Sequence, residues 1–169
     1  WREDYATQTA GGHSDFYDKA FLGKPGHDAW SGRAVRVFFN QVVKKPFAVA
    51  EIGGRDGSLA KVALESTPAI LRWTNYEISG AAVAGSLPKN ERYAPILATS
   101  FRWWQDIPIS GDVLILSHII EHLTDNDLSD LVGHIPKTII GVHVQAPIPL
   151  RGPTSWKGFA GAHILSMGW

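Results

Sequence analysis

Short apolar segments alternate with helix-like segments along most of the chain. The apolar runs occupy residues 47–53, 70–78, 94–98, 112–117 and 138–145. The amphipathic stretches between them occupy about residues 57–66, 79–87 and 124–133. Apolar runs of this length predict buried strands, and their alternation with helices predicts right-handed crossovers between parallel strands. The pattern therefore predicts an α/β fold, a doubly wound, mostly parallel sheet with helices on both faces.

Residues 1–45 do not follow this alternation. Ser14 is a suitable N-cap for a first helix, and residues 27–45 form a longer amphipathic stretch. We therefore expect two parts. An N-terminal helical or lid segment covers residues 1–45, and the core domain covers residues 46–169.

Composition and charge narrow the classes of partner. The 169 residues suffice for one domain, and 16 basic residues balance 16 acidic ones. A neutral chain offers no electrostatic footprint for a nucleic acid or an anionic membrane, so we expect neither as a partner. The chain has no cysteine, which excludes disulfides and thiolate metal sites and agrees with a cytoplasmic location. No apolar run reaches the roughly 20 residues that span a bilayer.

The motif EIGGRDG follows the first apolar run directly. It joins an acid, Glu51, to three glycines at positions 53, 54 and 57. Glycines at the end of a parallel strand let the chain turn sharply and let a ligand approach the main chain. The alternative is an ordinary turn between a strand and a helix. The nicotinamide-dinucleotide fingerprint does not fit, because Arg55 stands where that motif needs its middle glycine.

A second acid follows the second apolar run. Glu77 lies 20 residues beyond Gly57, close to the interval at which an acid meets a ribose diol in nucleoside-binding α/β folds. A carboxylate there can accept two hydrogen bonds from the diol. Alternatively, Glu77 caps the next helix together with Ser79. Combined with the glycine turn, the ribose interpretation is favoured.

Three motifs resemble those of the class I S-adenosylmethionine-dependent methyltransferases. EIGGRDGSLA, YEIS and GDVLILSHIIEHL stand in the order and at the spacing of that family's first, second and fourth motifs, over about residues 45–147. The resemblance implies a Rossmann-like fold and S-adenosyl-L-methionine as cofactor. It also implies methyl transfer to an acceptor, for which a small molecule with a hydroxyl oxygen is favoured.

The resemblance implies a set of residues around the cofactor. In the family, the first motif holds the amino-acid part, the second binds the ribose, the segment after the third strand surrounds the adenine, and the fourth lines the far side. The residues of this chain at those positions are Glu51, Gly53, Gly54 and Gly57, then Glu77 and Ile78, then Thr99, Ser100 and Phe101, and finally Ser117 and His118.

The C-terminal region is shorter than the family pattern. After the fifth strand the family adds a helix and an antiparallel strand pair, and Ser166 resembles the N-cap of that helix. We therefore expect a truncated C-terminus without the strand pair. The fifth strand would then expose its unpaired backbone groups, unless another element covers that edge.

The sequence H-I-I-E-H at the end of the fourth strand carries His118, Glu121 and His122. One hypothesis makes a histidine the general base for a hydroxyl acceptor, with Glu121 beside it. A second makes the three residues ligands of a divalent metal, resembling the E-x-x-E-H of some O-methyltransferases, with His143 or His163 as a fourth ligand. In a third, the histidines only form hydrogen bonds within the fold. We favour the base, and a metal is the least favoured.

The last segment, residues 146–169, is rich in glycine and proline and reads as a long loop over the methyl donor. Trp156 and His163 are the acceptor contacts predicted there, and Tyr17, beside Phe16, is the one predicted from the N-terminal side. A surface loop with incidental aromatics is the alternative. Trp103 and Trp104 are further candidates for pocket walls.

Two other functions remain alternatives. One is a catalytically silent methyltransferase-like module that serves as a docking or structural domain of a larger protein. The other is a nicotinamide oxidoreductase, which the glycine spacing disfavours. The sequence leaves homo-oligomer formation open.

Overall fold

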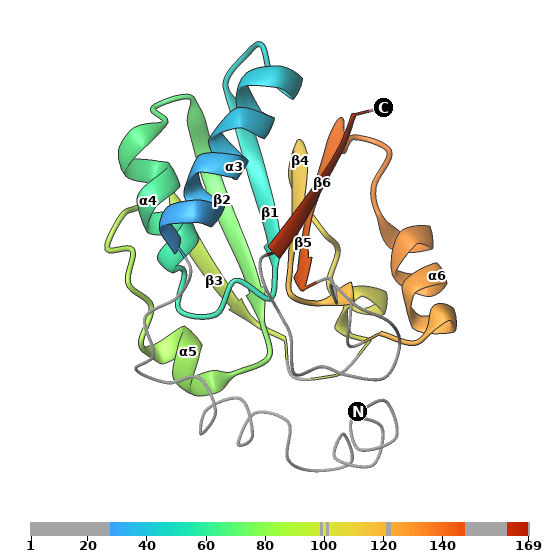
Figure 1. Ribbon diagram of the computed structural model, residues 1–169. Coiled ribbons are helices and arrows are strands. Elements are labelled where there is room, and N and C mark those ends of the chain that lie inside the picture. Colours follow the sequence, from blue (N-terminus) through green and yellow to red (C-terminus); the bar gives the residue numbers. More distant parts are fainter. Residues whose placement is uncertain (1–27, 99, 101, 121–122, 148–161, 169) are drawn as a thin grey trace.

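A six-stranded sheet with the order β3-β2-β1-β4-β5-β6 forms the centre of the molecule (Figure 1). The computed structural model describes residues 28–98, 100, 102–120, 123–147 and 162–168. The strands are β1 Phe47–Ile52, β2 Ile70–Glu77, β3 Tyr93–Leu97, β4 Val113–Ser117, β5 Gly141–Pro147 and β6 Ala162–Gly168. The first five are parallel, and β6 runs antiparallel to β5. The predicted fold class is confirmed.

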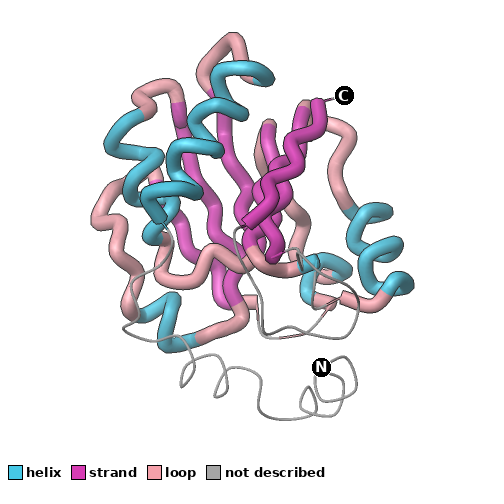
Figure 2. Tube along the Cα trace, viewed as in Figure 1, coloured by secondary structure: helices cyan, strands magenta, loops and turns pink. Residues whose placement is uncertain are grey.

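Helices cover both faces of this sheet (Figure 2). They are α3 Asp28–Val42, α4 Ser58–Ser66, α5 Gly80–Ala84, the 3₁₀ turn η1 Trp103–Gln105 and α6 Asp125–His134. The positions of α3, α4, α5 and α6 agree with the amphipathic stretches of the sequence, whereas η1 was not predicted. Among the described residues, no helix combines the length and the apolar character that crossing a bilayer requires.

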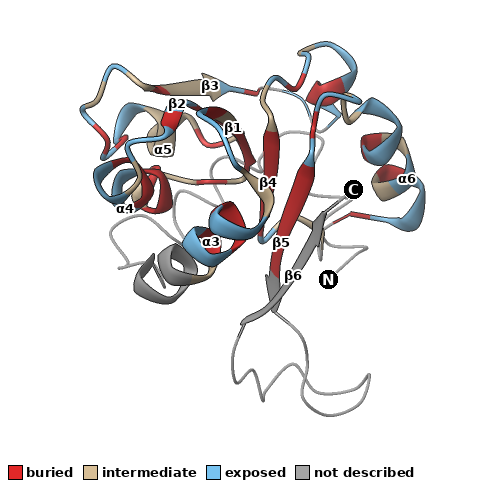
Figure 3. Cartoon of the chain, turned by 90° about the horizontal axis from the view of Figure 1, so that it is seen from above, coloured by how far each residue is buried: buried red, intermediate tan, exposed pale blue. Residues whose placement is uncertain are grey.

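Two apolar cores lie on the two faces of the sheet. Successive residues of a strand point to opposite faces, so each central strand contributes to both. Phe38 and Phe39 of α3 pack with α4 on one face, and Leu131 of α6 packs with η1 on the other. Figure 3 shows the buried residues along β4 and β5 between these layers. The helix predicted within residues 27–45 thus contributes to the core, while the division of the chain at residue 45 stays a prediction.

The two tryptophans considered as pocket walls are core residues instead. Trp103 and Trp104 are 3% and 4% exposed. The ring of Trp103 stacks on Tyr76 with ring centroids 4.6 Å apart and an interplanar angle of 8°. Such a stack adds to the apolar burial, so the pair fastens η1 to the sheet.

The expectations for the C-terminal end are partly wrong. Ser166, predicted as a helix N-cap, lies within β6 and pairs with His143 of β5. Because a strand edge offers unpaired N–H and C=O groups, β6 completes the ladder of β5, so the alternative of a covered edge holds and not the open one. The described residues contain one antiparallel strand here and not the pair that the family pattern has. Part of residues 146–169 is therefore a strand and not a loop.

Candidate functional site

The carboxyl ends of four parallel strands bring seven of the predicted site residues to one edge of the sheet, the lower edge in Figure 1. The residues there are Gly53 and Gly54 after β1, Glu77 and Ile78 at the end of β2, Ser100 after β3, and Ser117 and His118 at the end of β4. Parallel strands place their carboxyl ends together, where doubly wound sheets bind ligands. A surface hollow of about 480 Å³ beside Leu71, Arg72 and Arg92 lies at the opposite edge.

The turn after β1 is a sequence of left-handed backbone conformations. Gly53, Arg55 and Gly57 have φ values of 78°, 52° and 74°. A side chain at Gly53 would lie 2.6 Å from Ile119 and 2.8 Å from the carbonyl oxygen of Ser117, so β4 closes tightly on the turn. A side chain at Gly57 would collide with the hydroxyl of Tyr93. Arg55 thus adopts a conformation that glycine usually provides.

The amide of Asn75 holds this turn in place. Its Oδ1 accepts the N–H of Gly54 at 3.0 Å, and its Nδ2 donates to the carbonyl of Arg55 at 3.0 Å. Nδ2 also donates to the hydroxyl of Tyr93 at 2.9 Å, and Asn75 is fully buried. Burial raises the pKa of Tyr93 to about 12, so its hydroxyl stays neutral. Sequence reasoning missed Asn75, although a polar residue two positions before Glu77 in a buried strand was a usable signal.

The carboxylate of Glu77 joins the turn to the start of α5. Its Oε2 accepts the N–H of Arg55 at 2.8 Å, and its Oε1 accepts the N–H of Ser79 at 2.9 Å. Ser79 in turn caps α5 through its side chain. Burial raises the pKa of Glu77, against the lowering effect of these hydrogen bonds. The helix-capping alternative is therefore present, while two carboxylate oxygens have further acceptor positions that a ribose diol could use.

Glu51 lies beneath the turn. It is fully buried, and its carboxylate accepts hydrogen bonds from Trp73 Nε1 at 2.8 Å and from the Ser117 hydroxyl at 2.9 Å. A side chain at Gly54 would collide with the same carboxylate. Glu51 therefore connects β1, β2 and β4 below the edge, and its predicted contact with a cofactor stays a prediction.

His118 closes β4 in a left-handed conformation with φ 53°. Its N–H donates to the carbonyl of Gln145 at 2.7 Å, and its Nε2 lies 3.3 Å from Nε2 of the same glutamine. His118 is exposed and Gln145 is 4% exposed, so the glutamine supports the ring from below. Gln145 was missed, although a polar residue in the apolar run of β5 was a signal.

The residues described here do not assemble a metal centre. No group of three His, Asp or Glu side chains in the described part of the chain could hold a metal ion. His143, considered as a fourth ligand, is fully buried with its ring 5.3 Å from that of Phe38, and burial lowers its pKa to about 4. The structure therefore places His143 in the core against α3. Glu121 and His122 lie outside the described residues.

Several other predicted contacts are also outside the described part of the chain. They are Phe16, Tyr17, Thr99, Phe101 and Trp156. His163 lies in β6 opposite Ala146, but the structure does not describe its side chain. The predictions for these residues stay predictions.

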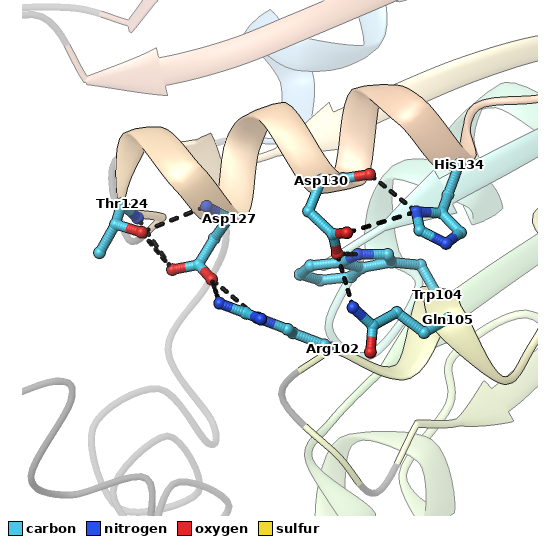
Figure 4. A network of polar contacts seen from close by, with 7 residues as sticks. All are labelled: Arg102, Trp104, Gln105, Thr124, Asp127, Asp130 and His134. Atoms are coloured by element: carbon cyan, nitrogen blue, oxygen red, sulfur yellow. Dashed lines mark hydrogen bonds and ion pairs between the residues drawn. The ribbon is translucent and has the colours of Figure 1, made fainter.

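A polar network fastens the segment after β3 to α6 (Figure 4). Arg102 donates from Nε and Nη2 to one oxygen of Asp127, at 2.9 Å and 2.6 Å. Asp130 accepts from Trp104 Nε1 at 2.8 Å and from Gln105 at 2.9 Å. Burial would raise the pKa of Asp127, but its hydrogen bonds with Thr124 and Arg102 hold it below its ordinary value. This anchor fixes the chain directly beyond Ser100.

Comparisons with known proteins identify the fold. No family model and no curated protein matches the chain. Among solved structures, the plantazolicin methyltransferase BpumL in complex with SAH matches with a TM-score of 0.62 at 14% identity, over 86% of this chain and 58% of that one. The methyltransferase domain of bacterial CtHen1 matches with a TM-score of 0.55 at 19% identity, over 70% of this chain and 65% of that one.

A third similar structure is a putative RNA methyltransferase, PH1948 from Pyrococcus horikoshii, with a TM-score of 0.56 at 11% identity, over 89% of this chain and 76% of that one. The chain spans less than two thirds of the BpumL and CtHen1 structures. These matches confirm the Rossmann-like fold of the class I methyltransferases, to which the sequence motifs pointed.

Proposed function

We propose that this chain, which has the class I methyltransferase fold, is an S-adenosyl-L-methionine-dependent methyltransferase for a small-molecule acceptor, with a hydroxyl oxygen as the methylated atom. The observation that carries the proposal is the hydrogen bond between Glu77 and the glycine turn. Oε2 of Glu77 accepts the N–H of Arg55 at 2.8 Å. This bond fixes the carboxylate of Glu77 beside the backbone of the glycine turn, at the edge where doubly wound sheets bind ligands. The neutral charge supports a small-molecule acceptor.

The residues at this edge fit the parts of the cofactor. Glu77 would accept the ribose diol, the turn at Gly53 would lie along the amino-acid part, and Ile78 and Ser100 would border the adenosine. Ile78 and Gly53 are partly exposed and Ser100 is exposed, so a ligand can reach them. The bound complex of BpumL with SAH supports the same type of ligand for this fold. When bound, S-adenosylmethionine supplies a methyl group carried on a positively charged sulfonium. The sulfur is the leaving group, and it becomes a neutral thioether.

The protein's own contribution to such a transfer is alignment and handling of one proton. Because the leaving group is neutral, most of the rate comes from holding the acceptor in line with the methyl carbon. A hydroxyl acceptor also loses a proton, for which the sequence offers His118, His122 and Glu121. Tyr17, Trp156 and His163 are proposed contacts to the acceptor. A divalent metal at H-x-x-E-H is the less favoured alternative, and the cytoplasm is the proposed compartment.

The second candidate is a catalytically silent methyltransferase-like module. The observation that favours it is Arg55, a partly buried arginine in the left-handed conformation of the glycine turn. If its side chain occupied the cofactor's place, the fold would persist without its ligand.

Calorimetric titration of the full chain with S-adenosylhomocysteine separates the two candidates. We expect micromolar binding and, at a hundredfold excess over the dissociation constant, about 2.7 kcal/mol of added stability. Nicotinamide dinucleotide serves as the matched control and should give neither effect. If S-adenosylhomocysteine gives no heat and no thermal shift, the silent module is the better description.

A further inference from the structure

Gln145 makes two contacts with one residue, His118. Its carbonyl accepts the backbone N–H of His118 at 2.7 Å, and its side-chain Nε2 lies 3.3 Å from the ring Nε2. The first contact fixes where the chain leaves β4, and the second fixes the rotation of the imidazole. Both ends of the histidine are therefore held by one residue of β5.

The backbone of His118 needs such support. A φ of 53° is uncommon outside glycine, although histidine tolerates it better than most residues. Conformations of this kind persist where the surrounding structure determines them, and they are frequent at functional sites. Ile119, the next residue, packs against Gly53 of the glycine turn. The unusual conformation thus lies directly beside the proposed cofactor site.

Gln145 belongs to a buried polar row just below the carboxyl edge. Four adjacent strands, β2, β1, β4 and β5, contribute buried polar side chains to the same face, and Asn75, Glu51, Ser117 and Gln145 are among them. Each is less than 9% exposed. Burying a polar side chain is unfavourable unless it forms hydrogen bonds, and the contact that the structure gives the Nε2 of Gln145 is the ring of His118.

The hydrogen bond between Nε2 of Gln145 and Nε2 of His118 determines which ring nitrogen of His118 carries the proton. An amide NH₂ group is a donor only, so the imidazole Nε2 accepts the hydrogen bond. In neutral histidine one ring nitrogen accepts and the other carries the proton. The proton of neutral His118 is then on Nδ1.

We propose that Gln145 is a positioning residue that fixes His118 as the Nδ1-protonated tautomer, with the Nε2 lone pair already engaged. In this state Nδ1 of His118 carries the proton and the Nε2 lone pair is engaged, so the ring has no lone pair left to remove a proton. His118 is then excluded as the general base, and the base among the H-x-x-E-H residues is a different one. The use of His118 in methyl transfer rests on the proposed function, while the tautomer is a property of the free chain.

Nitrogen-proton correlation spectra of the imidazoles in the ¹⁵N-labelled full chain test the tautomer without any ligand. The His118 signals are assigned from their loss in His118→Asn. We expect the signature of a protonated Nδ1 and an unprotonated Nε2. A protonated Nε2 in the unmodified neutral protein would overturn the proposal.

The variant Gln145→Glu provides the sharper test. A carboxylate accepts only, so it should move the ring proton of His118 to Nε2. The control within each spectrum is His134, whose Nδ1 lies 2.8 Å from the carbonyl oxygen of Asp130 and should stay protonated. An unchanged His118 tautomer in Gln145→Glu would also refute the proposal. If this variant fails to fold, the spectrum of the unmodified chain still decides.

The same experiments keep the two proposals distinguishable. Failure of S-adenosylhomocysteine binding with the expected tautomer would remove the proposed function and leave the role of Gln145 intact. Binding of S-adenosylhomocysteine together with a protonated Nε2 of His118 would support the proposed function and remove the proposed role of Gln145.

Discussion

The carboxylate of Glu77 accepts the backbone N–H of Arg55, a residue 22 positions earlier in the chain, at 2.8 Å. Its other oxygen accepts the N–H of Ser79 at 2.9 Å. One side chain therefore fixes the glycine turn after β1 relative to the helix start after β2. The loops after β1 and β2, across which a ligand would lie, are therefore connected by the single carboxylate of Glu77.

Replacing Glu77 tests its role as the ribose acceptor. Glu77→Gln keeps the size of the side chain but removes the charge that strengthens its hydrogen bonds, so we expect S-adenosylhomocysteine affinity to fall at least about tenfold. Titration calorimetry measures the change, and Glu65→Gln, at an exposed position of α4, is the matched control. An unchanged affinity in Glu77→Gln would show that the ribose assignment is wrong.

The pH dependence of stability gives a second, ligand-free test of Glu77. Burial raises its pKa, so the folded chain keeps the proton to higher pH than the unfolded chain does. The free energy of unfolding should therefore fall as pH rises from the ordinary value of about 4.5 through the raised value. Urea unfolding across this range should show that fall in the unmodified chain and a smaller one in Glu77→Gln. Equal slopes in the two chains would show that folding does not raise the pKa of Glu77.

Arg55 tests the difference between an active and a silent site. Arg55→Gly relieves the left-handed backbone but adds flexibility to the unfolded chain, so we expect stability to change by less than about 1 kcal/mol. Arg55→Val places a β-branched residue at a positive φ and should destabilise by about 1–3 kcal/mol.

Ligand binding in these variants separates the two functions. If the unmodified chain binds S-adenosylhomocysteine, Arg55→Gly should bind it at least as well. If only Arg55→Gly binds it, the arginine side chain occupies the place of the cofactor and the silent module is correct.

Much of the fold was predictable from the sequence because buried parallel strands are continuous apolar runs. The run 70–78 became β2 and the run 112–117 became β4, each within one residue at either end. β6 was not predictable in this way. Its sequence, AHILSMG, has polar and small residues at positions that also suit a helix start, and only pairing with β5 decides its conformation.

The spacing of glycines and acids in the sequence predicted part of the site. The buried amide side chains of the site were not predicted. Gly53, Gly57 and Glu77 lie at the expected edge because strand ends determine their positions. Asn75 and Gln145 were missed, because the partners of their side chains lie far away in the sequence, in the glycine turn for Asn75 and at the ring of His118 for Gln145. A single polar letter in an apolar strand does not reveal which loop it contacts.

Asn75 should control both the stability and the shape of the glycine turn. Asn75→Ala leaves the buried N–H of Gly54 and the carbonyl of Arg55 without this partner, so we expect a loss of about 2–5 kcal/mol. Tyr93→Phe removes the hydrogen bond between the Tyr93 hydroxyl and Asn75 and should cost about 1 kcal/mol. Urea unfolding of both variants and of the double variant gives the coupling energy, expected at about 0.5–3 kcal/mol. Strict additivity would show that the two side chains act independently.

The ion pair between Arg102 and Asp127 should make the anchor between η1 and α6 sensitive to acid (Figure 4). Although burial opposes it, hydrogen bonds with Thr124 and Arg102 lower the pKa of Asp127, so the folded chain binds this proton less readily than the unfolded chain. The stabilisation is therefore complete above the ordinary value of about 3.8 and is lost as pH falls through the lowered value.

Asp127→Asn should lower the free energy of unfolding at pH 7 by about 1–2 kcal/mol, since it also weakens the capping box of α6. The difference from the unmodified chain should shrink as pH falls below 3.8, because the unmodified aspartate then becomes neutral as well. Asp125→Asn, on the same helical turn, controls for the loss of charge near a helix start. In an Arg102→Gln background the effect of Asp127→Asn should be smaller. A difference that stays constant from pH 7 to pH 3 would show that the charge of Asp127 does not hold this anchor.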